Sequence, residues 1–344
     1  MKGRHAIMDV DSFPTGIITI DRAFGCGGVP LGRIVEMYGT ESSGKTTTTL
    51  RFIAACQKHF FTKKNRNGVA AFIDVEHALD PEWAYRNGVD METLLTSQPD
   101  SGEDALNIVE TMIKSGEVDL IIVDSVAALI PKAELEGEIG DHHVGAQAKM
   151  MSQGLRKIKG VASQKQATVV FINQVREKVG VVFGNPEVTP GGKALKYYST
   201  IRAQISRKNI IKDGEESIGI TSVIKMVKNK AAAPFVIGEY NICFGMPARP
   251  VFGIDAVASL LSVAEEENIV TKKGSFYRFE NTAMGNGINN TLRFLQENAE
   301  IYKKIEQQTY DRVFHFVQES KESARSVDNV LDELESDDFA ESEE

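Results

Sequence analysis

The sequence predicts an α/β fold with a mostly parallel central sheet, followed by a small C-terminal α+β domain. In the first two-thirds of the chain, short apolar segments rich in β-branched residues alternate with amphipathic helical segments. A glycine-rich loop joins the first long strand of this series to a helix. After about residue 249 the pattern changes, which places the core at residues 10–249 and the small domain at residues 250–326.

The core elements follow one another in regular order. Strands are expected at RIVEMYG, VAAFIDV, DLIIVDS and TVVFINQ, and helices at Lys45–Lys58, near Asp104–Lys114 and across Gly145–Gly160. Because these strands are almost continuously apolar and are separated by helices, they predict a parallel sheet covered on both faces. Further strands at Tyr197–Ser206, Ser222–Val227 and Glu239–Phe244 continue the sheet with antiparallel members.

The end of the chain has two parts that differ in composition. GIDAVASLLSVAEEENIV, KKGSFYRFE and NNTLRFLQENAEIYKKIEQQTYDRVFHFV predict a helix, a hairpin and further helix. Residues 327–344 carry too few apolar side chains to fold alone and predict a disordered tail. This tail holds nine acidic and no basic residues, so the net charge of -9 belongs to it and the preceding chain is neutral. A neutral body is compatible with local basic contacts to a polyanion.

Composition excludes several classes of protein. The chain has 344 residues, 42% hydrophobic and 25% charged, as in ordinary globular proteins. The apolar runs are strand-sized and MKGRHAIMDV has no signal-peptide pattern, so we expect a cytoplasmic protein without membrane contact. Cys26, Cys56 and Cys243 show no metal-ligand or disulfide spacing.

The segment Gly39–Thr46, GTESSGKT, matches the phosphate-binding pattern GxxxxGK[ST] in its required place between strand and helix. Its glycines let backbone N–H groups surround phosphates at a helix N-terminus. Lys45 is expected to reach the β- and γ-phosphates, and Thr46 to hold Mg²⁺. The alternative is a plain Gly/Ser-rich turn, which the flanking strand and helix disfavour. The motif therefore predicts ATP and Mg²⁺ as ligands.

Two carboxylates end predicted strands near this loop. Asp124 follows LIIV and is the candidate Mg²⁺-side acid, although such an Asp is also common as a helix cap. Glu76 follows AFIDV and is the candidate that orients the attacking water. Position alone favours a surface role for Glu76, because charged side chains at strand ends usually face water.

Several long strings together resemble the bacterial RecA recombinase family. They are GRIVEMYGTESSGKTTTTL, AAFIDVEHALDP, LIIVDSVAALIPKAELEGEIGD, MMSQGLRKIKG, VVFINQVREKVGVVFGNPEVTPGGKALKYY and VKNKAAAPF. The resemblance runs from about Val10 to about Val317 and implies a RecA-like P-loop NTPase core. It further implies a DNA-dependent ATPase that polymerises on single-stranded DNA and catalyses homologous pairing and strand exchange. A cellular and a phage-encoded member both fit.

The resemblance also implies roles for individual residues. Glu76 becomes the catalytic carboxylate, acting with Lys45 and with Gln174 as the γ-phosphate sensor. Lys228 and Lys230 act in trans on the nucleotide of a neighbouring subunit; without the resemblance they would be exposed strand lysines. The full nucleotide set is Gly39, Thr40, Glu41, Ser42, Ser43, Gly44, Lys45, Thr46, Thr47, Asp80, Trp83, Asp124 and Gly245, with Thr46 and Asp124 on the metal.

Two Gly-rich segments, 136–144 and 175–192, are the expected DNA-binding loops, because long loops in compact domains are usually functional or disordered. Basic groups neutralise phosphates and an apolar ring can pack against bases, a combination that suits the binding of single-stranded nucleic acid. The alternative for the segment 175–192 is a flexible lid over the nucleotide. On the intervening helix, Lys149, Arg156 and Lys159 form one basic stripe opposite an expected core face. The DNA candidates are Lys149, Arg156, Arg176, Lys178, Phe183, Gly191, Gly192 and Lys193.

The implied partners are single-stranded DNA, homologous duplex DNA, further copies of the chain in a helical filament, and a LexA-like repressor. The family normally has an N-terminal helix and strand that pack on the neighbour, so residues 1–9 are expected to be a truncated N-terminal segment. Phe244 stands where the family usually has a Tyr. Two alternatives stay open: a helicase or repair motor on the same core, and a truncated regulator without strand exchange.

Overall fold

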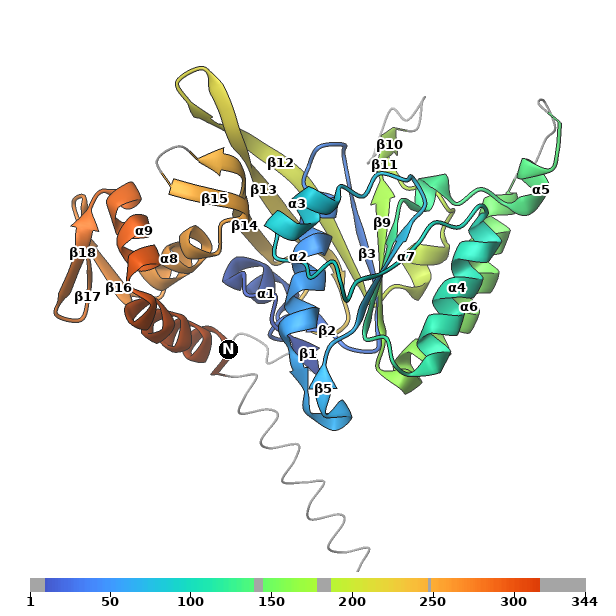
Figure 1. Cartoon of the computed structure of the whole chain (residues 1–344), viewed down its shortest axis with the longest axis horizontal. Coiled ribbons are helices and arrows are strands. Elements are labelled where there is room, and N and C mark those ends of the chain that lie inside the picture. The colour runs from blue at the N-terminus through green and yellow to red at the C-terminus, as the bar shows by residue number, and fades with distance from the viewer. Residues whose placement is uncertain (1–9, 139–144, 178–186, 247–248, 316–344) are drawn as a thin grey trace, which may run out of the picture.

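The structure is a computed structural model that describes residues 10–138, 145–177, 187–246 and 249–315. Its centre is a nine-stranded sheet with the strand order β15-β14-β13-β12-β3-β9-β8-β6-β7 (Figure 1). The expected residues 139–144 and 178–186 of the two DNA loops, and the tail 327–344, lie outside the described residues. So does the segment 1–9.

Six neighbouring strands of the sheet are parallel. In spatial order they are β12 (Ile201–Asp213), β3 (Ile34–Gly39), β9 (Thr168–Gln174), β8 (Leu120–Asp124), β6 (Ala70–Asp74) and β7 (Leu95–Ser97). The four strands expected from the apolar runs are confirmed, and their carboxyl ends meet at one edge of the sheet. That edge is where parallel α/β sheets bind ligands.

Helices cover both faces of the parallel part. α2 (Lys45–Lys58) packs on one face, and α4 (Gly102–Ser115) and α6 (Ala146–Lys165) pack on the other (Figure 1). Strand β9 has apolar side chains on both faces of the sheet. Val170 and Ile172 belong to the core with α2, while Val169 and Phe171 belong to the core with α4 and α6. Alternate side chains of a strand point to opposite faces, so a strand buried on both sides is apolar throughout.

The remaining three strands extend the sheet in antiparallel fashion. They are β13 (Glu216–Asn229), β14 (Ile237–Met246) and β15 (Arg249–Ile254). The expected strand Tyr197–Ser206 is wrong at its start, because α7 (Ala194–Tyr198) occupies those residues and β12 runs on to Asp213. The polar part of this strand pairs with β13 as a projecting hairpin, and alternation of buried side chains is lost there.

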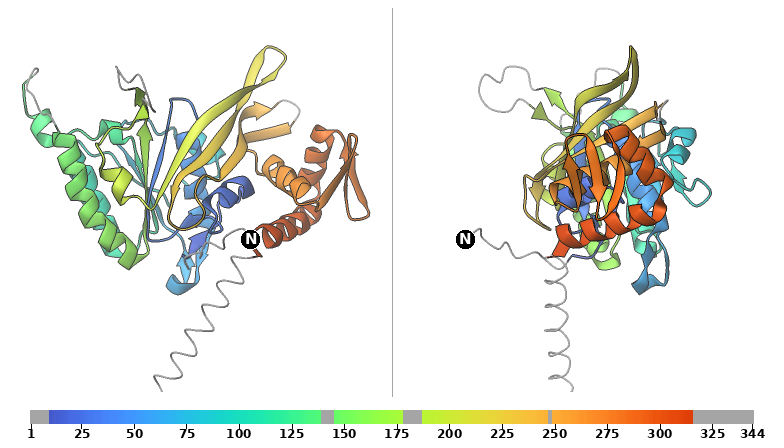
Figure 2. Two further views of the ribbon diagram at one scale, coloured as in Figure 1. Left: turned by 180° about the vertical axis from the view of Figure 1, so that it is seen from behind. Right: turned by 90° about the vertical axis from the view of Figure 1, so that its left-hand side faces the viewer.

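The sheet continues past the expected domain boundary at residues 249/250, because β15 pairs with β14 as its edge strand. The small domain then holds α8 (Ala256–Glu266), the hairpin strands β16 (Val270–Lys273), β17 (Phe276–Phe279) and β18 (Thr282–Asn286), α9 (Ile288–Glu297) and a helix over 299–315. These elements enclose a core of their own. Figures 1 and 2 show this domain at the β15 end of the sheet, far from α4 and α6.

Shorter elements complete the described chain. They are β1 (Ser12–Phe13), α1 (Ile18–Phe24), β2 (Val29–Pro30), β4 (Phe60–Phe61), the 3₁₀ turn η1 (Thr62–Lys64), β5 (Arg66–Asn67), α3 (Pro81–Arg86), the 3₁₀ turn η2 (Val126–Ala128), α5 (Lys132–Leu135), and the pair β10 (Arg176–Glu177) and β11 (Glu187–Val188). Within the described part of the chain, every helix is too short or too polar to cross a bilayer.

Candidate nucleotide and DNA site

The glycine-rich loop lies between β3 and α2, as the motif requires. Gly44 is the N-cap of α2 with a left-handed φ of 93°, and a Cβ there would lie 2.3 Å from Ile242 Cδ1. Only glycine tolerates this conformation and this close approach. The Lys45 ammonium donates to the carbonyl oxygens of Gly39 at 3.1 Å and Thr40 at 2.7 Å, which holds the side chain along the loop. The loop therefore has the shape and the donors of a phosphate cradle.

Thr46 and Asp124 meet beside this loop. The Thr46 hydroxyl donates to Asp124 Oδ2 at 3.2 Å. Burial raises the pKa of Asp124 to about 6, the Thr46 hydrogen bond opposes this shift, and the Glu76 and Asp74 carboxylates add to it. Burial likewise lowers the pKa of Lys45. A buried carboxylate with an excess of negative charge around it suits a divalent cation.

Mg²⁺ fits these residues. It is usually held by one or two protein oxygens together with phosphates and water, not by an all-protein cage. A cluster of three or more His, Cys, Asp or Glu side chains able to hold a metal is absent from the residues described. The hydroxyl of Thr46 and the carboxylate of Asp124 would hold the ion, which would neutralise phosphate charge when bound.

Glu76 and Gln174 come together from different strands. Gln174 ends β9, Glu76 follows β6, and Gln174 Nε2 donates to Glu76 Oε1 at 3.3 Å. The Glu76 side chain is exposed and Gln174 is half-buried. The structure thus places both predicted residues at the carboxyl edge of the sheet, 98 positions apart in sequence and in contact in space.

Trp83, one of the predicted nucleotide residues, lies against α2. Trp83 Nε1 donates to Thr47 Oγ1 at 3.1 Å, and the Trp83 ring lies 6.3 Å from the Phe244 ring with a tilt of 55°. Phe244 is 47% exposed and Gly245 follows it. The Asp80 carboxylate is used locally, because it caps α3 by accepting from the N–H groups of Glu82 and Trp83.

The two lysines of VKNK differ in their surroundings. Lys228 Nζ donates to the carbonyl oxygens of Lys196 at 2.8 Å, Tyr197 at 3.3 Å and Ser199 at 2.6 Å, at the end of α7. Burial lowers its pKa, with Lys230 and Arg202 adding to the effect. Lys230 is exposed. A lysine that stabilises the carbonyl end of a helix has a structural role in the single subunit.

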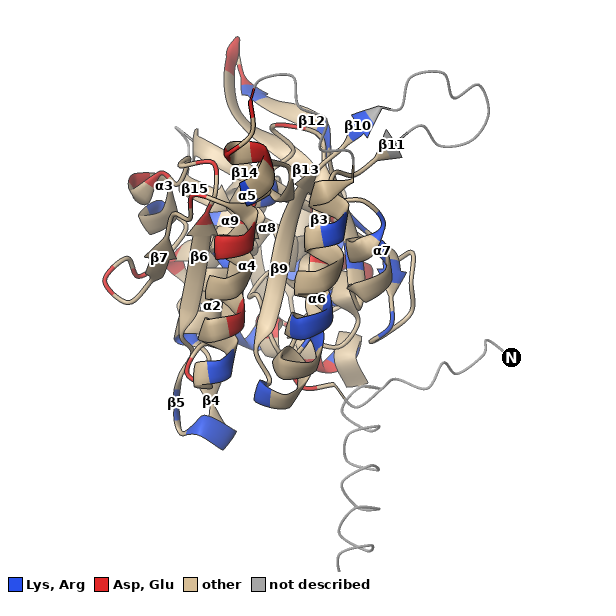
Figure 3. Ribbon diagram, turned by 90° about the vertical axis from the view of Figure 1, so that its right-hand side faces the viewer, with Lys and Arg blue, Asp and Glu red and all other residues tan. Residues whose placement is uncertain are grey.

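The predicted DNA side chains gather on one side of the molecule. Figure 3 shows Lys and Arg over α6, α7 and β10, whereas Asp and Glu dominate the neighbouring α4. Lys149, Arg156 and Lys159 of α6 are exposed, and the opposite face, with Met150, Met151, Leu155 and Ile158, is buried as predicted. Arg176 and Lys193 are exposed too. Lys178 and Phe183 lie outside the described residues.

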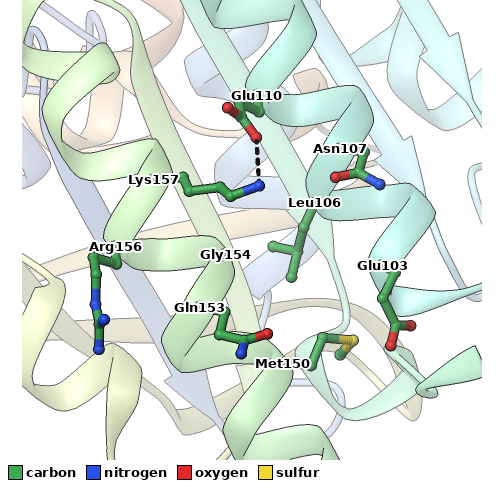
Figure 4. Close-up of a pocket in the computed structure, with 9 residues that line it drawn as sticks. All are labelled: Glu103, Leu106, Asn107, Glu110, Met150, Gln153, Gly154, Arg156 and Lys157. Atoms are coloured by element: carbon green, nitrogen blue, oxygen red, sulfur yellow. Dashed lines mark ion pairs between the residues drawn. The ribbon is translucent and has the colours of Figure 1, made fainter. Parts of the chain in front are cut away.

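A groove runs between α4 and α6 (Figure 4). In it, Lys157 Nζ lies 3.8 Å from Glu110 Oε2, and Glu110 Oε1 pairs with Lys114 at 2.6 Å. Figure 4 shows Arg156 pointing away from Glu110. No residue of the glycine-rich loop lines this groove. Both side chains are exposed, but Lys157 faces Glu110 of α4 and Arg156 does not.

A buried polar network near the site was missed from the sequence. Glu36 in β3 is fully buried; its Oε2 accepts from Arg202 Nε at 2.5 Å and its Oε1 from Asn173 Nδ2 at 3.2 Å. The Arg202 guanidinium also lies 4.6 Å above the Tyr38 ring. The signal was present in IVEMY, because an acid inside an apolar strand needs a partner when the strand is buried on both faces.

Comparison with known proteins gives the family. The family described as RecA N-terminal domain matches residues 1–248, and the RecA C-terminal domain matches residues 258–313. The chain belongs to the RecA family. Protein RecA of Acidothermus cellulolyticus is 49% identical over 311 residues, covering 90% of this chain and 86% of that protein. Protein RecA of Prochlorococcus marinus is 52% identical over 304 residues, covering 88% of this chain and 76% of that protein.

Protein RecA of Clostridioides difficile is 46% identical over 330 residues, covering 96% of this chain and 90% of the relative. The matches extend through both RecA domains, which favours a recombinase over a helicase on the same core. This RecA-family chain is thus a recombinase of DNA recombination and repair, and its enzyme activity is DNA-dependent ATP hydrolysis.

Proposed function

We propose that this chain binds Mg²⁺–ATP in the Gly39–Thr47 loop and couples its hydrolysis to holding single-stranded DNA in a filament of many copies. The observation that carries this proposal is the contact between Gln174 and Glu76. It joins the expected water-orienting carboxylate to the strand that leads into the segment 175–192. Hydrolysis and DNA binding therefore have a shared structural element.

In this proposal the residues at the nucleotide have separate tasks. Lys45 turns from the loop carbonyls to the β- and γ-phosphates, Glu76 accepts a hydrogen bond or a proton from the attacking water, and Gln174 donates to the γ-phosphate. Trp83 supplies an aromatic face for adenine. When Mg²⁺ is bound by Thr46 and Asp124, it neutralises charge on the phosphates.

The second copy of the chain completes the site. Lys230 is exposed just after β13 and can face a nucleotide held by a neighbour. Lys228 can do so when its ammonium leaves the carbonyl oxygens at the end of α7. DNA follows the basic face of α6, α7 and β10, which binds phosphates without reading sequence. The small domain captures duplex DNA, the acidic tail competes with DNA, and a LexA-like repressor binds the filament in the cytoplasm.

The test is ATP turnover measured with and without single-stranded DNA, followed by electron microscopy with a nonhydrolysable ATP analogue. We expect turnover to rise at least tenfold with DNA, and filaments to form with the analogue. Lys45→Ala should abolish turnover in both conditions. Turnover indifferent to DNA, together with the absence of filaments, would instead support a regulator without strand exchange.

A further inference from the structure

One peptide unit, between Pro190 and Gly191, is held on both sides by side-chain amides. Its carbonyl oxygen accepts from Asn173 Nδ2 at 3.1 Å, and its N–H donates to Gln147 Oε1 at 3.1 Å. Asn173 precedes Gln174 in β9, and Gln147 lies in the first turn of α6. The peptide therefore joins the strand of the γ-phosphate sensor to the helix that carries the basic stripe.

The amide of Asn173 has only one workable orientation. Its Nδ2 also donates to the Glu36 carboxylate at 3.2 Å, and its Oδ1 accepts from the backbone N–H of Gln174 at 3.0 Å. A carboxylate and a carbonyl only accept, so the nitrogen must face both. Arg202 fixes Glu36 in turn through its other oxygen. Asn173 is fully buried, and its amide is hydrogen-bonded directly to the backbone of Gln174.

Gln147 makes the corresponding connection to the other strand of the nucleotide site. Its Nε2 donates to the carbonyl oxygens of Val126 and Leu129, each at 3.1 Å. Val126 and Leu129 belong to the turn around η2, which follows β8, and β8 ends at Asp124. Gln147 thus ties Gly191 to the chain that leaves the metal-side carboxylate.

The backbone after the held peptide is tightly packed. Gly191 and Gly192 have left-handed φ values of 82° and 73°. A Cβ on Gly191 would lie 2.9 Å from Val126 Cγ1, and one on Gly192 would lie 2.7 Å from Ala148 Cβ. Lys193 follows as the N-cap of α7. Because this segment is in direct contact with η2 and α6, a displacement of the peptide reaches the basic face.

We infer that Asn173 and Gln147 are positioning residues that clamp the Pro190–Gly191 peptide and pass the state of the nucleotide site to the DNA-binding face. This inference rests on the proposed function and adds the residues that carry the coupling. A shift of the Gln174 backbone moves the amide that holds Pro190, while a shift after Asp124 moves Gln147. Both side chains bond only to groups of the protein in the hydrogen bonds given above.

The experiment uses Asn173→Ala and Gln147→Ala in the full chain, with Gln57→Ala as the matched control. Gln57 makes the same kind of link far from the site, donating to Asp90 O at 2.8 Å and accepting from Asp90 N–H at 2.9 Å. Turnover is measured without DNA and with saturating poly-dT. Both clamp variants should lose at least fivefold in stimulation, with turnover without DNA and ATP affinity within twofold of the parent.

A second measurement follows strand β11, which lies just before the clamped Pro190–Gly191 peptide. Val188 of β11 is 45% exposed and the three native cysteines are buried, so Val188→Cys can be labelled with a fluorophore selectively. A nonhydrolysable ATP analogue without DNA should change the fluorescence in the parent and in Gln57→Ala, and not in either clamp variant. Gln147 is half-buried and does not support Glu36, so Gln147→Ala should fold even where Asn173→Ala does not.

The outcomes separate this inference from the proposed function. Equal losses with and without DNA, or full stimulation and a normal fluorescence response in both folded variants, would overturn the clamp. If the parent itself shows no stimulation by DNA, the proposed function fails. The fluorescence response to the analogue would still decide whether Asn173 and Gln147 connect the nucleotide to β11.

Discussion

Gln174 Nε2 lies 3.3 Å from Glu76 Oε1, and this contact brings the ends of β9 and β6 together at the phosphate loop. One partner is an amide and can only hydrogen-bond, whereas the other is a carboxylate and can also take a proton. The pair therefore divides sensing from water activation. Substitutions of the two residues should have different kinetic signatures.

Glu76→Gln should reduce turnover with DNA by about 100-fold or more, because the amide cannot accept a proton from water. ATP affinity should change little, since the substitution keeps the size of the side chain and its contact with Gln174. The measurement is single-turnover ATP hydrolysis with poly-dT, together with nucleotide binding at equilibrium. Gln174→Ala serves as the comparison: it should lose DNA stimulation with a smaller loss of turnover without DNA. Equal effects of both substitutions would contradict the division of roles.

Lys228→Ala and Lys230→Ala should differ in stability and agree in activity. Each should lower DNA-stimulated turnover about 10- to 100-fold if both ammonium groups act across the subunit interface. Lys228→Ala should also lower the melting temperature, because three carbonyl oxygens at the end of α7 lose their donor. Lys230→Ala should leave the melting temperature unchanged. A fully active Lys230→Ala protein would show that Lys230 does not act on the nucleotide.

Arg156→Ala and Lys157→Ala compare neighbouring basic residues of α6. Arg156 points away from Glu110 and should contact phosphate, whereas Lys157 lies 3.8 Å from Glu110. Arg156→Ala should weaken binding to poly-dT and reduce the slope of log affinity against log salt by about 0.7 per lost phosphate contact. Lys157→Ala should have little effect on either quantity. Fluorescence anisotropy at a series of salt concentrations measures the affinity and its salt slope. A larger effect of Lys157→Ala than of Arg156→Ala would place DNA on the α4 side.

The buried Asp21 should make the stability of the junction between the domains depend on pH. Its Oδ1 accepts from Thr15, its Oδ2 accepts from the Tyr310 hydroxyl at 2.6 Å, and burial raises its pKa from 3.8 to about 6. The folded state holds the proton more tightly than the unfolded state. Stability from this group is therefore lost as pH rises from about 4 to about 6, and the loss stays constant above that range.

Asp21→Asn removes this titration. The variant should gain about 2–3 kcal/mol relative to the parent between pH 4 and pH 7, since each unit of pKa shift corresponds to about 1.4 kcal/mol. Thermal unfolding of both proteins at several pH values measures the difference. The control is Asp311→Asn, an exposed change on the same C-terminal helix as Tyr310. This variant should have nearly the same stability as the parent at each pH. A pH-independent difference between parent and Asp21→Asn would refute the assignment.

The sequence by itself determined the parallel core and the phosphate loop. Gly39–Thr46 and the four apolar strands could be predicted because glycine spacing and strand burial are local properties. The buried face of α6 was predictable for the same reason, since Met150 and Leu155 recur with the helical period. The start of β12 was not, because α7 and the strand form from the same mixed segment, and contact with the sheet decides between them.

Only the tertiary structure decided which polar groups meet. The contact of Glu76 with Gln174, the burial of Glu36 beside Arg202, and the two amides on one peptide of the Gly-rich segment each join distant parts of the chain. Local patterns place such residues at strand ends or inside strands. The order of strands in the sheet determines their partners, and that order arises from packing of the whole core.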